Sequence, residues 1–261
     1  MNVQNQANLM KQERQALLLD TLEREGKVVA SEWSERLSVS EDTVRRDLRE
    51  LARQQKLQRV HGGALPRSRS SAAYAVRERH AGAEKSAIGQ AAAKLVTDGQ
   101  LIFVDGGTTT LQLAQHLPAE LRATVVTNSP PVAIALAAHP HVEVILLGGR
   151  FYKPAQVTVG AAAIEELQRF HADICFLGVC SLHPAVGVSI EDFEEAHIKR
   201  AMIANAAEVA GLVVADKLGT ALPYVVAPAS ALTYLITDAG ADDARLAAYR
   251  QAGVTVMQAG N

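Results

Sequence analysis

Six residues that suit phosphate binding follow the apolar run LIFV at positions 101–104. They are Asp105, Gly106, Gly107, Thr108, Thr109 and Thr110. The helical pattern LQLAQHL comes directly after them, so a strand runs into a helix through glycines. Backbone N–H groups at such a turn, with the positive end of the helix dipole behind them, bind phosphate. The segment lacks both a P-loop lysine and the third glycine of a dinucleotide fingerprint, so neither a nucleoside triphosphate nor NAD is indicated.

Two more turns of this kind follow later strand patterns. Asn128 and Ser129 come after TVVT, and Gly148 and Gly149 come after VEVILL. In an open α/β sheet, ligands bind outside the carboxyl ends of the strands, which is where all three turns would lie. We therefore expect these four residues to belong to the same ligand site.

Charged residues farther along the chain are candidates to complete the ligand site. Glu195 lies four residues before Lys199, and Lys217 follows the strand pattern LVVAD directly. Such groups suit sugar hydroxyls and a phosphate. For the neighbouring acids Asp192 and Glu194, a solvated helix start favoured by the helix dipole is the better interpretation.

A second group of residues has types and spacing that suit DNA. In SVSEDTVRRDLRELARQQ, Val44, Leu48 and Leu51 share one face of a helix, which leaves the opposite face to arginines. Guanidinium groups fit phosphates and guanine edges, and small polar groups at a helix start suit the major groove. After this helix LQRV predicts a strand, and His61-Gly62-Gly63 predicts the turn of a β-wing. The predicted DNA-contacting residues are Ser40, Thr43, Arg45, Arg46, Arg49, Lys56, Arg59 and His61.

The arginines have an alternative interpretation as a solvated face paired with Asp47 and Glu50, as in most runs of charge. The order of the elements favours DNA instead: a helix, a short helix, a Ser-capped turn, an arginine-bearing helix and a basic wing. The distribution of charge agrees. Residues 1–69 hold 13 Lys and Arg against 10 Asp and Glu, whereas the whole chain has a net charge of −2.

The elements that must position these residues change along the chain. Helical spacing and a β-wing occupy about the first 65 residues, and the polar stretch PRSRSS follows them. Strand patterns then alternate with Ala-rich helical segments, which indicates a mainly parallel sheet covered on both faces. We predict an α/β fold class, with a winged helix-turn-helix domain at 1–65, a linker at 66–80 and a larger Rossmann-like sensor domain at 81–261. The predicted strands are LIFVD, TVVT, VEVILL, ICFLGV, LVVAD, YLIT and VTVM.

Composition and cysteine use exclude several classes of protein. Hydrophobic residues make up 48% of the 261 residues and charged residues 21%, as in folded globular proteins. No apolar run approaches the roughly 20 residues that span a bilayer, and the start lacks a signal peptide, so we expect a cytoplasmic protein with no membrane partner. Cys175 and Cys180 lie in the strand pattern ICFLGVC, which predicts reduced thiols and no metal site.

These motifs together resemble the DeoR family of transcriptional regulators. SVSEDTVRRDLRELARQQKLQRVHGGA is similar to the family's N-terminal signature, with Gln55 where the family usually has Gly. A left-handed backbone there costs Gln more than Gly. The second half resembles the family's effector domain, which is similar in fold to ribose-5-phosphate isomerase and implies sugar-phosphate binding. Its marks are Glu84-Lys85, Asp105 to Thr110, Thr127 to Ser129, Gly148-Gly149, Glu194 to Ala196 with Lys199, and Asp216-Lys217. In the family, two residues usually separate that Asp from its Lys.

Two other classes of function were weighed against a regulator. Isomerases of this fold carry Asp-Gly-Ala-Asp after a central strand, where this chain has Leu177-Gly178-Val179-Cys180, so both acids needed for proton transfer are missing. A nucleic-acid scaffold without a ligand leaves the phosphate-binding turn unexplained. We therefore predict a transcriptional repressor of a carbohydrate-metabolism operon, with no catalytic residues and no cofactor. Its partners are double-stranded operator DNA, a small phosphorylated metabolite, and copies of itself in a homodimer or homotetramer that reads two half-sites.

Overall fold

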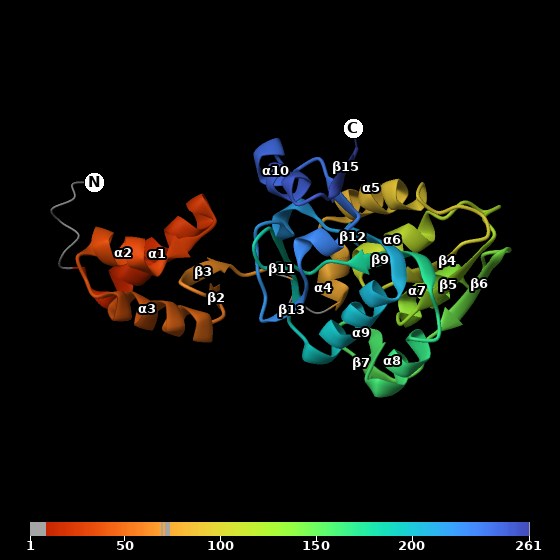
Figure 1. The fold of residues 1–261 in the computed structure, drawn as a ribbon, viewed down its shortest axis with the longest axis horizontal. Coiled ribbons are helices and arrows are strands. Elements are labelled where there is room, and N and C mark those ends of the chain that lie inside the picture. Colours follow the sequence, from red (N-terminus) through yellow and green to blue (C-terminus); the bar gives the residue numbers. More distant parts are fainter. Residues whose placement is uncertain (1–8, 69, 71–73, 261) are drawn as a thin grey trace. The chain divides into compact units, whose positions relative to one another are not determined.

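The computed structural model describes residues 9–68, 70 and 74–260, which form two compact units (Figure 1). The smaller unit runs to Ser68 and includes Gly219–Pro223, and the larger one contains the rest of the chain. Of the predicted linker at 66–80, residues 69 and 71–73 lie outside the described residues, and Tyr74–Arg79 forms helix α4 of the larger unit. The domain boundaries given above stay predictions.

The smaller unit is a three-helix domain with a small antiparallel sheet. Its elements are α1 (Lys11–Glu25), β1 (Val28–Val29), α2 (Ala30–Leu37), α3 (Glu41–Arg53), β2 (Leu57–Val60) and β3 (Gly63–Pro66). The strand order is β1-β3-β2, so β2 and β3 form the predicted wing hairpin around His61-Gly62. Gly26 ends α1 with a φ of 72°, a left-handed conformation that favours glycine.

The core of the smaller unit lies between the three helices. Leu18 and Leu22 of α1 and Trp33 of α2 are buried there. The apolar face predicted for the third helix is confirmed: its three residues are each at most 1% exposed and join the same core, namely Val44, Leu48 and Leu51. The opposite face of α3 is therefore exposed.

In the described part of the larger unit, a seven-stranded sheet has the order β15-β14-β12-β9-β4-β5-β6. All of its neighbouring strands are parallel, as predicted. The strands are β4 (Leu101–Val104), β5 (Ala123–Thr127), β6 (Val142–Leu146), β9 (Ala172–Gly178), β12 (Ala206–Leu212), β14 (Tyr234–Asp238) and β15 (Thr255–Ala259). The strand predicted at LVVAD lies earlier in the chain, because β12 ends at Leu212 and contains only the first residue of that pattern. Strand β12 is AAEVAGL, whose Ala and Gly residues have low strand propensity, so its pattern is weak.

Helices cover both faces of this sheet (Figure 1). On one face, Ile102 and Val104 pack in a core with α5 (Gly82–Ala93), α6 (Thr108–Gln115) and α7 (Pro130–Leu136). On the other, Phe103 packs with α8 (Ala161–Leu167), α9 (Phe193–Ala204) and α10 (Asp243–Gln251). Alternate residues of a strand point to opposite faces, so each strand contributes to two cores. The sheet is therefore buried on both sides, and its strand ends are left for binding.

Short elements surround the carboxyl ends of the strands. They are the hairpin of β7 (Arg150–Tyr152) and β8 (Val157–Val159), the 3₁₀ helix η3 (Ala215–Lys217), the 3₁₀ helix η4 (Ala229–Ala231), and a second sheet of β10 (Leu182–His183), β11 (Gly187–Ile190) and β13 (Tyr224–Ala227). Cys175 is buried in β9, and Cys180 lies just beyond its end. No helix among the described residues is long and apolar enough to cross a membrane, and these residues include no cluster of ligands that would hold a metal ion.

Candidate DNA interface and ligand site

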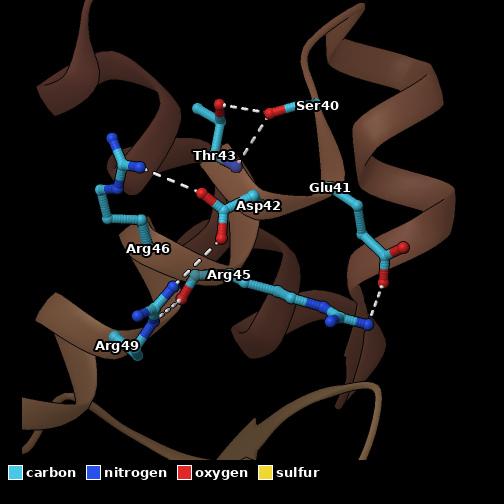
Figure 2. A network of polar contacts seen from close by, with 7 residues as sticks. All are labelled: Ser40, Glu41, Asp42, Thr43, Arg45, Arg46 and Arg49. Carbon is cyan, nitrogen blue, oxygen red and sulfur yellow. Dashed lines mark hydrogen bonds and ion pairs between the residues drawn. The ribbon is translucent and has the colours of Figure 1, made fainter.

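Helix α3 begins at a polar cap (Figure 2). The Ser40 side chain accepts a hydrogen bond from the Thr43 backbone N–H at 3.2 Å, and the two hydroxyl oxygens lie 2.8 Å apart. This is the Ser cap predicted from the sequence, and it satisfies a backbone group that the first turn of a helix leaves unpaired. It places both hydroxyls at the start of the arginine-bearing helix.

The arginines of α3 pair with acids in its own first turn (Figure 2). Arg45 lies 2.7 Å from Glu41, and Arg46 and Arg49 lie 3.0 and 3.3 Å from the two oxygens of Asp42. The side chains of these arginines are between 51% and 72% exposed. Exposed ion pairs contribute only about 0–1 kcal/mol, so a DNA phosphate can displace these acids at little cost.

Asp47 and Glu50 do not pair with the arginines of the strip, as the alternative interpretation would require. Asp47 is 3% exposed and accepts a hydrogen bond from Arg14 of α1 at 2.9 Å. Glu50 pairs with Lys11, which is also in α1. These acids tie α3 to α1. The arginine face is therefore distinct from the acidic residues that position the helix.

A hollow of about 630 Å³ lies between α3 and the wing strand β2. Its lining contains four arginines and one alanine, namely Arg46, Arg49, Arg53, Arg59 and Ala52. A smaller hollow beside it joins Arg45, Arg59 and His61. Five of the eight predicted residues thus lie on the surface formed by these two hollows, whose linings do not include Ser40 or Thr43. Arg53 belongs to this surface although the predicted set omits it, whereas Lys56 lines a different hollow with residues of α1.

The connection from α3 to the wing has a left-handed residue that is not glycine. Gln55 has a φ of 59°, and its N–H donates to the Ala52 carbonyl at 2.9 Å. The Lys56 N–H donates to the Leu51 carbonyl at 3.0 Å. This is the conformation that the departure from the family pattern implied, and a side chain makes it costly.

In the larger unit, the predicted turn at Asp105 lies at the point where the chain changes direction across the sheet. Strand β4 has β5 on one side and β9 on the other, and the crossovers that leave β4 and β9 lead to opposite edges. Such a switch point opens a crevice outside the carboxyl ends of the strands. Asp105 follows β4, and Gly178 ends β9, so both lie at this crevice.

A buried ion pair joins these two strand ends. The Lys199 ammonium contacts Asp105 and donates to the Gly178 carbonyl at 2.9 Å, and Asp105 also accepts from the Gly178 N–H at 2.9 Å. Both charged side chains are 2% exposed. Burial lowers the pKa of Lys199, but the acidic groups around it, of which Asp105 contributes most, together outweigh burial and hold that pKa above its usual value. The pair stabilises the floor of the crevice.

The two glycines after Asp105 are required by close contacts and backbone conformation. A Cβ on Gly106 would lie 2.0 Å from a Val157 methyl of β8, so the hairpin packs directly on the turn. Gly107 has a φ of 154° and ψ of 160°, which side chains disfavour. The glycines let a strand, a helix start and the hairpin meet in one place.

Buried polar side chains surround this turn. Five are at most 5% exposed: Thr108, Thr109, Thr110, Asn128 and Ser129. The Thr110 hydroxyl donates to the Gly107 carbonyl at 2.9 Å, and the Asn128 amide donates to the Thr158 carbonyl at 3.3 Å. By contrast, Asn128 Oδ1 and Ser129 Oγ are buried without a hydrogen-bond partner. An unsatisfied buried polar atom costs about 1–3 kcal/mol, so these two are candidates for ligand contacts.

The third predicted turn differs from the other two. Gly148 and Gly149 are exposed and lead into the β7–β8 hairpin, not into a helix. The Gly148 N–H donates to Glu166 at 3.0 Å, so this turn has no helix dipole and one amide already in use. Its part in ligand binding stays a prediction.

Two acids of the sequence IEDFEE lie in different environments, and the predicted ligand contact of Glu195 stays a prediction. Asp192 caps α9, because its carboxylate accepts from the Glu195 N–H at 2.9 Å. Glu195 is 9% exposed, and burial raises its pKa to about 7, with Lys199 opposing the shift. A carboxyl group with this pKa changes charge near neutral pH.

Three cations gather near the crevice in addition to Lys199. The Lys217 ammonium donates to the Val179 carbonyl at 3.3 Å, and burial lowers the pKa of Lys217. Burial also lowers the pKa of Lys85 to about 8, and the charges of Lys217 and Arg77 add to this shift. The predicted ligand set omitted Lys85 and Arg77, since α5 and α4 precede the sheet and carry no strand-end signal. The family mark Glu84-Lys85 was the only sequence signal near them.

An arginine-faced winged helix-turn-helix and an α/β sheet with a polar crevice define the class: a DNA-binding regulator with a ligand-binding domain. Two family models match the chain. One is described as "DeoR C terminal sensor domain" and matches residues 80–239, and the other is described as "DeoR-like helix-turn-helix domain" and matches residues 14–69. The chain belongs to the DeoR family of transcriptional regulators, as the sequence motifs implied.

Full-length relatives agree with this assignment. The HTH-type transcriptional repressor GlcR of Bacillus subtilis is 34% identical over 88% of this chain and 89% of its own length. The glycerol-3-phosphate regulon repressor of Escherichia coli is 31% identical over 85% of this chain and 88% of its own length. Ribose 5-phosphate isomerase A of Methanocaldococcus jannaschii aligns over 53% of each chain with 18% identity and a TM-score of 0.38. The family and these relatives identify the protein as a transcriptional regulator.

Proposed function

We propose that this regulator is a cytoplasmic repressor of a carbohydrate-metabolism operon, whose affinity for its operator changes when a sugar phosphate or related metabolite binds. The names of two similar regulators support the proposal, since both are repressors and one controls a glycerol-3-phosphate regulon. The two halves of the proposal rest on different units and are argued separately.

The observation that carries the ligand half is the pair of orphaned polar atoms beside the Gly106 turn. Ser129 Cβ lies 3.7 Å from the place where a Gly106 Cβ would be, so its hydroxyl is close to the backbone that leads into α6. That hydroxyl is a donor for a phosphate oxygen, and Asn128 Oδ1 is an acceptor for a sugar hydroxyl. A phosphorylated polyol supplies both kinds of group. We assign the ligand contacts to the residues predicted above, with these two at the centre.

The DNA half rests on the exposed arginine face of α3 and on the wing. Within the part of the chain that the structure describes, Arg45, Arg46 and Arg49 are bound by exposed acids of the same helix or its backbone carbonyls. Ser40 and Thr43 lie at the helix start, and Arg59 and His61 extend the surface along the wing. Phosphate contacts of the wing provide salt-dependent affinity, and the helix reads base edges. A homodimer or homotetramer would hold two such surfaces against two half-sites.

The ligand half is tested by a thermal-shift screen against phosphorylated sugars and glycerol phosphates, because stabilisation grows with ligand concentration over Kd. Ser129→Ala should abolish most of the shift without destabilising the unliganded protein, since it removes an unsatisfied hydroxyl. Thr237→Val is the matched control, because Thr237 Oγ1 is also buried and unsatisfied but lies at the end of β14. The ligand half of the proposal would be refuted if Ser129→Ala showed a normal ligand-induced thermal shift, or if the wild type showed no shift with any compound of the panel.

The DNA half is tested by fluorescence anisotropy with the promoter upstream of the protein's own operon. Arg46→Gln should weaken binding by about 1–3 kcal/mol and relax specificity at one base pair. Arg24→Gln is the matched control, since Arg24 forms a similar exposed i,i+4 ion pair with Asp20 on α1. Equal losses for the two variants would show that the face of α3 does not read the operator.

A further inference from the structure

Helix α4 (Tyr74–Arg79) is tied at both ends to loops at the carboxyl ends of the strands. Before the helix, Ser70 Oγ donates to the Cys180 carbonyl at 2.7 Å. After the helix, His80 Nε2 lies 3.0 Å from Asp216 Oδ2. Cys180 follows β9 and Asp216 lies in η3, which follows β12. The segment therefore reaches two neighbouring strand ends of the ligand-binding sheet.

A buried lysine holds the last turn of this helix. The Lys85 ammonium of α5 donates to the backbone carbonyls of Arg77 and His80, and Lys85 is 3% exposed. A cation on the carbonyls at a helix C-terminus is favourable, because those groups have no partner within the helix. Movement of α4 away from the sheet would leave this buried ammonium without these acceptors. The position of α4 is thus coupled to the interior of the larger unit.

The side chain of Arg77 lies among the elements that surround the crevice. Its guanidinium donates to the Pro154 carbonyl at 3.4 Å, in the turn of the β7–β8 hairpin that packs on Gly106. Its positive charge contributes to the lowered pKa values of Lys85 and Lys217 and opposes the raised pKa of Glu195. These three residues come from α5, η3 and α9. Arg77 thus contacts the hairpin that packs on the Gly106 turn, and its charge acts on groups of three other elements beside the crevice.

We propose that Arg77 is an effector-binding residue contributed by α4, and that effector binding through it fixes the position of α4. This inference rests on the proposed function, since it takes the effector to be a phosphorylated metabolite. A guanidinium binds a phosphate through two parallel hydrogen bonds, whereas the Lys199 ammonium is already held by Asp105 and Gly178. Arg77 supplies the effector's phosphate with a guanidinium cation.

The location of α4 in the chain makes this contact regulatory. The smaller unit ends at Ser68, and α4 begins at Tyr74, so the segment that carries the DNA-binding unit leads directly into α4. An effector that binds Arg77 therefore acts on the first α-helix that follows the DNA-binding unit in the chain. By linkage, whatever docks α4 more firmly also raises the affinity for the effector by the same factor.

The test uses the full chain with inorganic phosphate as the probe, titrated at constant ionic strength with sodium chloride. Isothermal titration calorimetry gives the affinity, and hydrogen–deuterium exchange reports on residues 74–80 and, separately, on residues 105–110. The variants are Arg77→Gln, Arg77→Lys, and the matched control Arg79→Gln, whose exposed arginine lies on the same helix. Loss of a charge-assisted hydrogen bond should weaken phosphate binding of Arg77→Gln about tenfold or more.

We expect phosphate to slow exchange at both segments in the wild type and in Arg79→Gln. In Arg77→Gln, saturating phosphate should still protect residues 105–110 but no longer residues 74–80, and Arg77→Lys should recover part of the affinity. A purely structural role of Arg77 would instead lower the melting temperature and leave the phosphate affinity unchanged, which overturns the inference. A wild type that binds neither phosphate nor any sugar phosphate contradicts the proposed function itself. If the wild type binds phosphate and Arg77→Gln binds it with the same affinity and the same protection of residues 74–80, the inference about Arg77 is contradicted and the proposed function is not.

Discussion

Replacement of the buried Asp105–Lys199 pair tests whether the ligand site is built on an internal ion pair. Each side chain is 2% exposed, so neither charge gains much from water. Asp105→Asn leaves the ammonium of Lys199 buried with the Gly178 carbonyl, and Lys199→Met leaves the carboxylate of Asp105 with the Gly178 N–H. Removal of one partner of a buried pair costs about 3–5 kcal/mol, and we expect the lower end here because one hydrogen bond remains in each case.

The double variant Asp105→Asn/Lys199→Met should be less destabilised than the two single changes added together. With both charges gone, no uncompensated charge is buried, and only packing and hydrogen bonds are lost. We expect the double variant to be more stable than additivity predicts by about 3 kcal/mol, which is the coupling energy of the pair.

Urea unfolding measures these energies if the two units are followed separately. The single tryptophan of the chain, Trp33, lies in the core of the smaller unit, so its fluorescence reports on that unit. Circular dichroism at 222 nm reports on both units, and the transition absent from the fluorescence belongs to the larger one. Additive effects of the two changes would show that the charges do not interact. A shift of the Trp33 transition would show that the damage is not confined to the larger unit.

Other consequences of the structure are open to similar measurements. Asp47→Asn should destabilise the smaller unit by about 2–4 kcal/mol in Trp33 fluorescence, since it leaves the Arg14 guanidinium with a neutral amide oxygen in place of its buried carboxylate, whereas the exposed control Asp42→Asn should change stability by less than about 0.5 kcal/mol. Gln55→Gly should raise the same stability by about 0.5–1 kcal/mol because it relieves a left-handed side-chain residue, and a lower urea midpoint would contradict this. The folded pKa of Glu195 is raised from 4.5 to about 7, so the folded state loses up to about 3 kcal/mol as pH rises through that window. Glu195→Gln should therefore raise the melting temperature more at pH 8 than at pH 5, and an equal pH-dependent gain in the half-exposed control Glu194→Gln would reject burial as the cause.

Much of the fold could be predicted because local patterns and global structure agree in this chain. The face of α3 that contains Leu48 is buried, and the Ser40 cap is present, since both depend on residues within one or two helical turns. The strand LIFV and its neighbours form the parallel sheet, because apolar runs that alternate with helices leave few other arrangements. The predicted position of one strand was wrong at β12, because its Ala and Gly residues have low strand propensity and the neighbouring strands of the sheet determine its position.

The partners of the charged residues were beyond a sequence-based prediction. Asp47 was grouped with the arginines of its own helix but pairs with Arg14, 33 residues away. Lys199 was assigned to the ligand, and its ammonium contacts Asp105, 94 positions earlier in the chain. Such pairings depend on how helices pack across a core or a sheet, which no spacing within one element encodes. The location of Arg77 near the crevice also depends on tertiary packing, because the short helix α4, which precedes the sheet in the chain, lies against the strand ends.

The pairing of Lys199 changes which charges are available to an anionic effector. Because Asp105 neutralises Lys199, the pair adds no net charge to the crevice. The cations that remain nearby are Arg77, Lys85 and Lys217, and burial lowers the pKa of both lysines. In the unliganded site their charged forms are costly, because they are desolvated and repel one another.

A bound phosphate dianion stabilises the charged lysines, so its binding must raise their pKa values and take up protons. Lys85 has a pKa of about 8 without ligand, and above that pH a growing share of the binding energy is spent on protonating it. The affinity for phosphate should therefore fall as pH rises from 8 to 10, and calorimetry in buffers of different ionisation enthalpy should detect the proton uptake. Lys85→Met should remove part of this pH dependence. Arg77→Gln should weaken binding throughout the range and move the fall in affinity to higher pH, because the charge of Arg77 contributes to the lowered pKa of Lys85. Phosphate binding that is independent of pH above 8 in the wild type would show that the buried lysines do not face the effector.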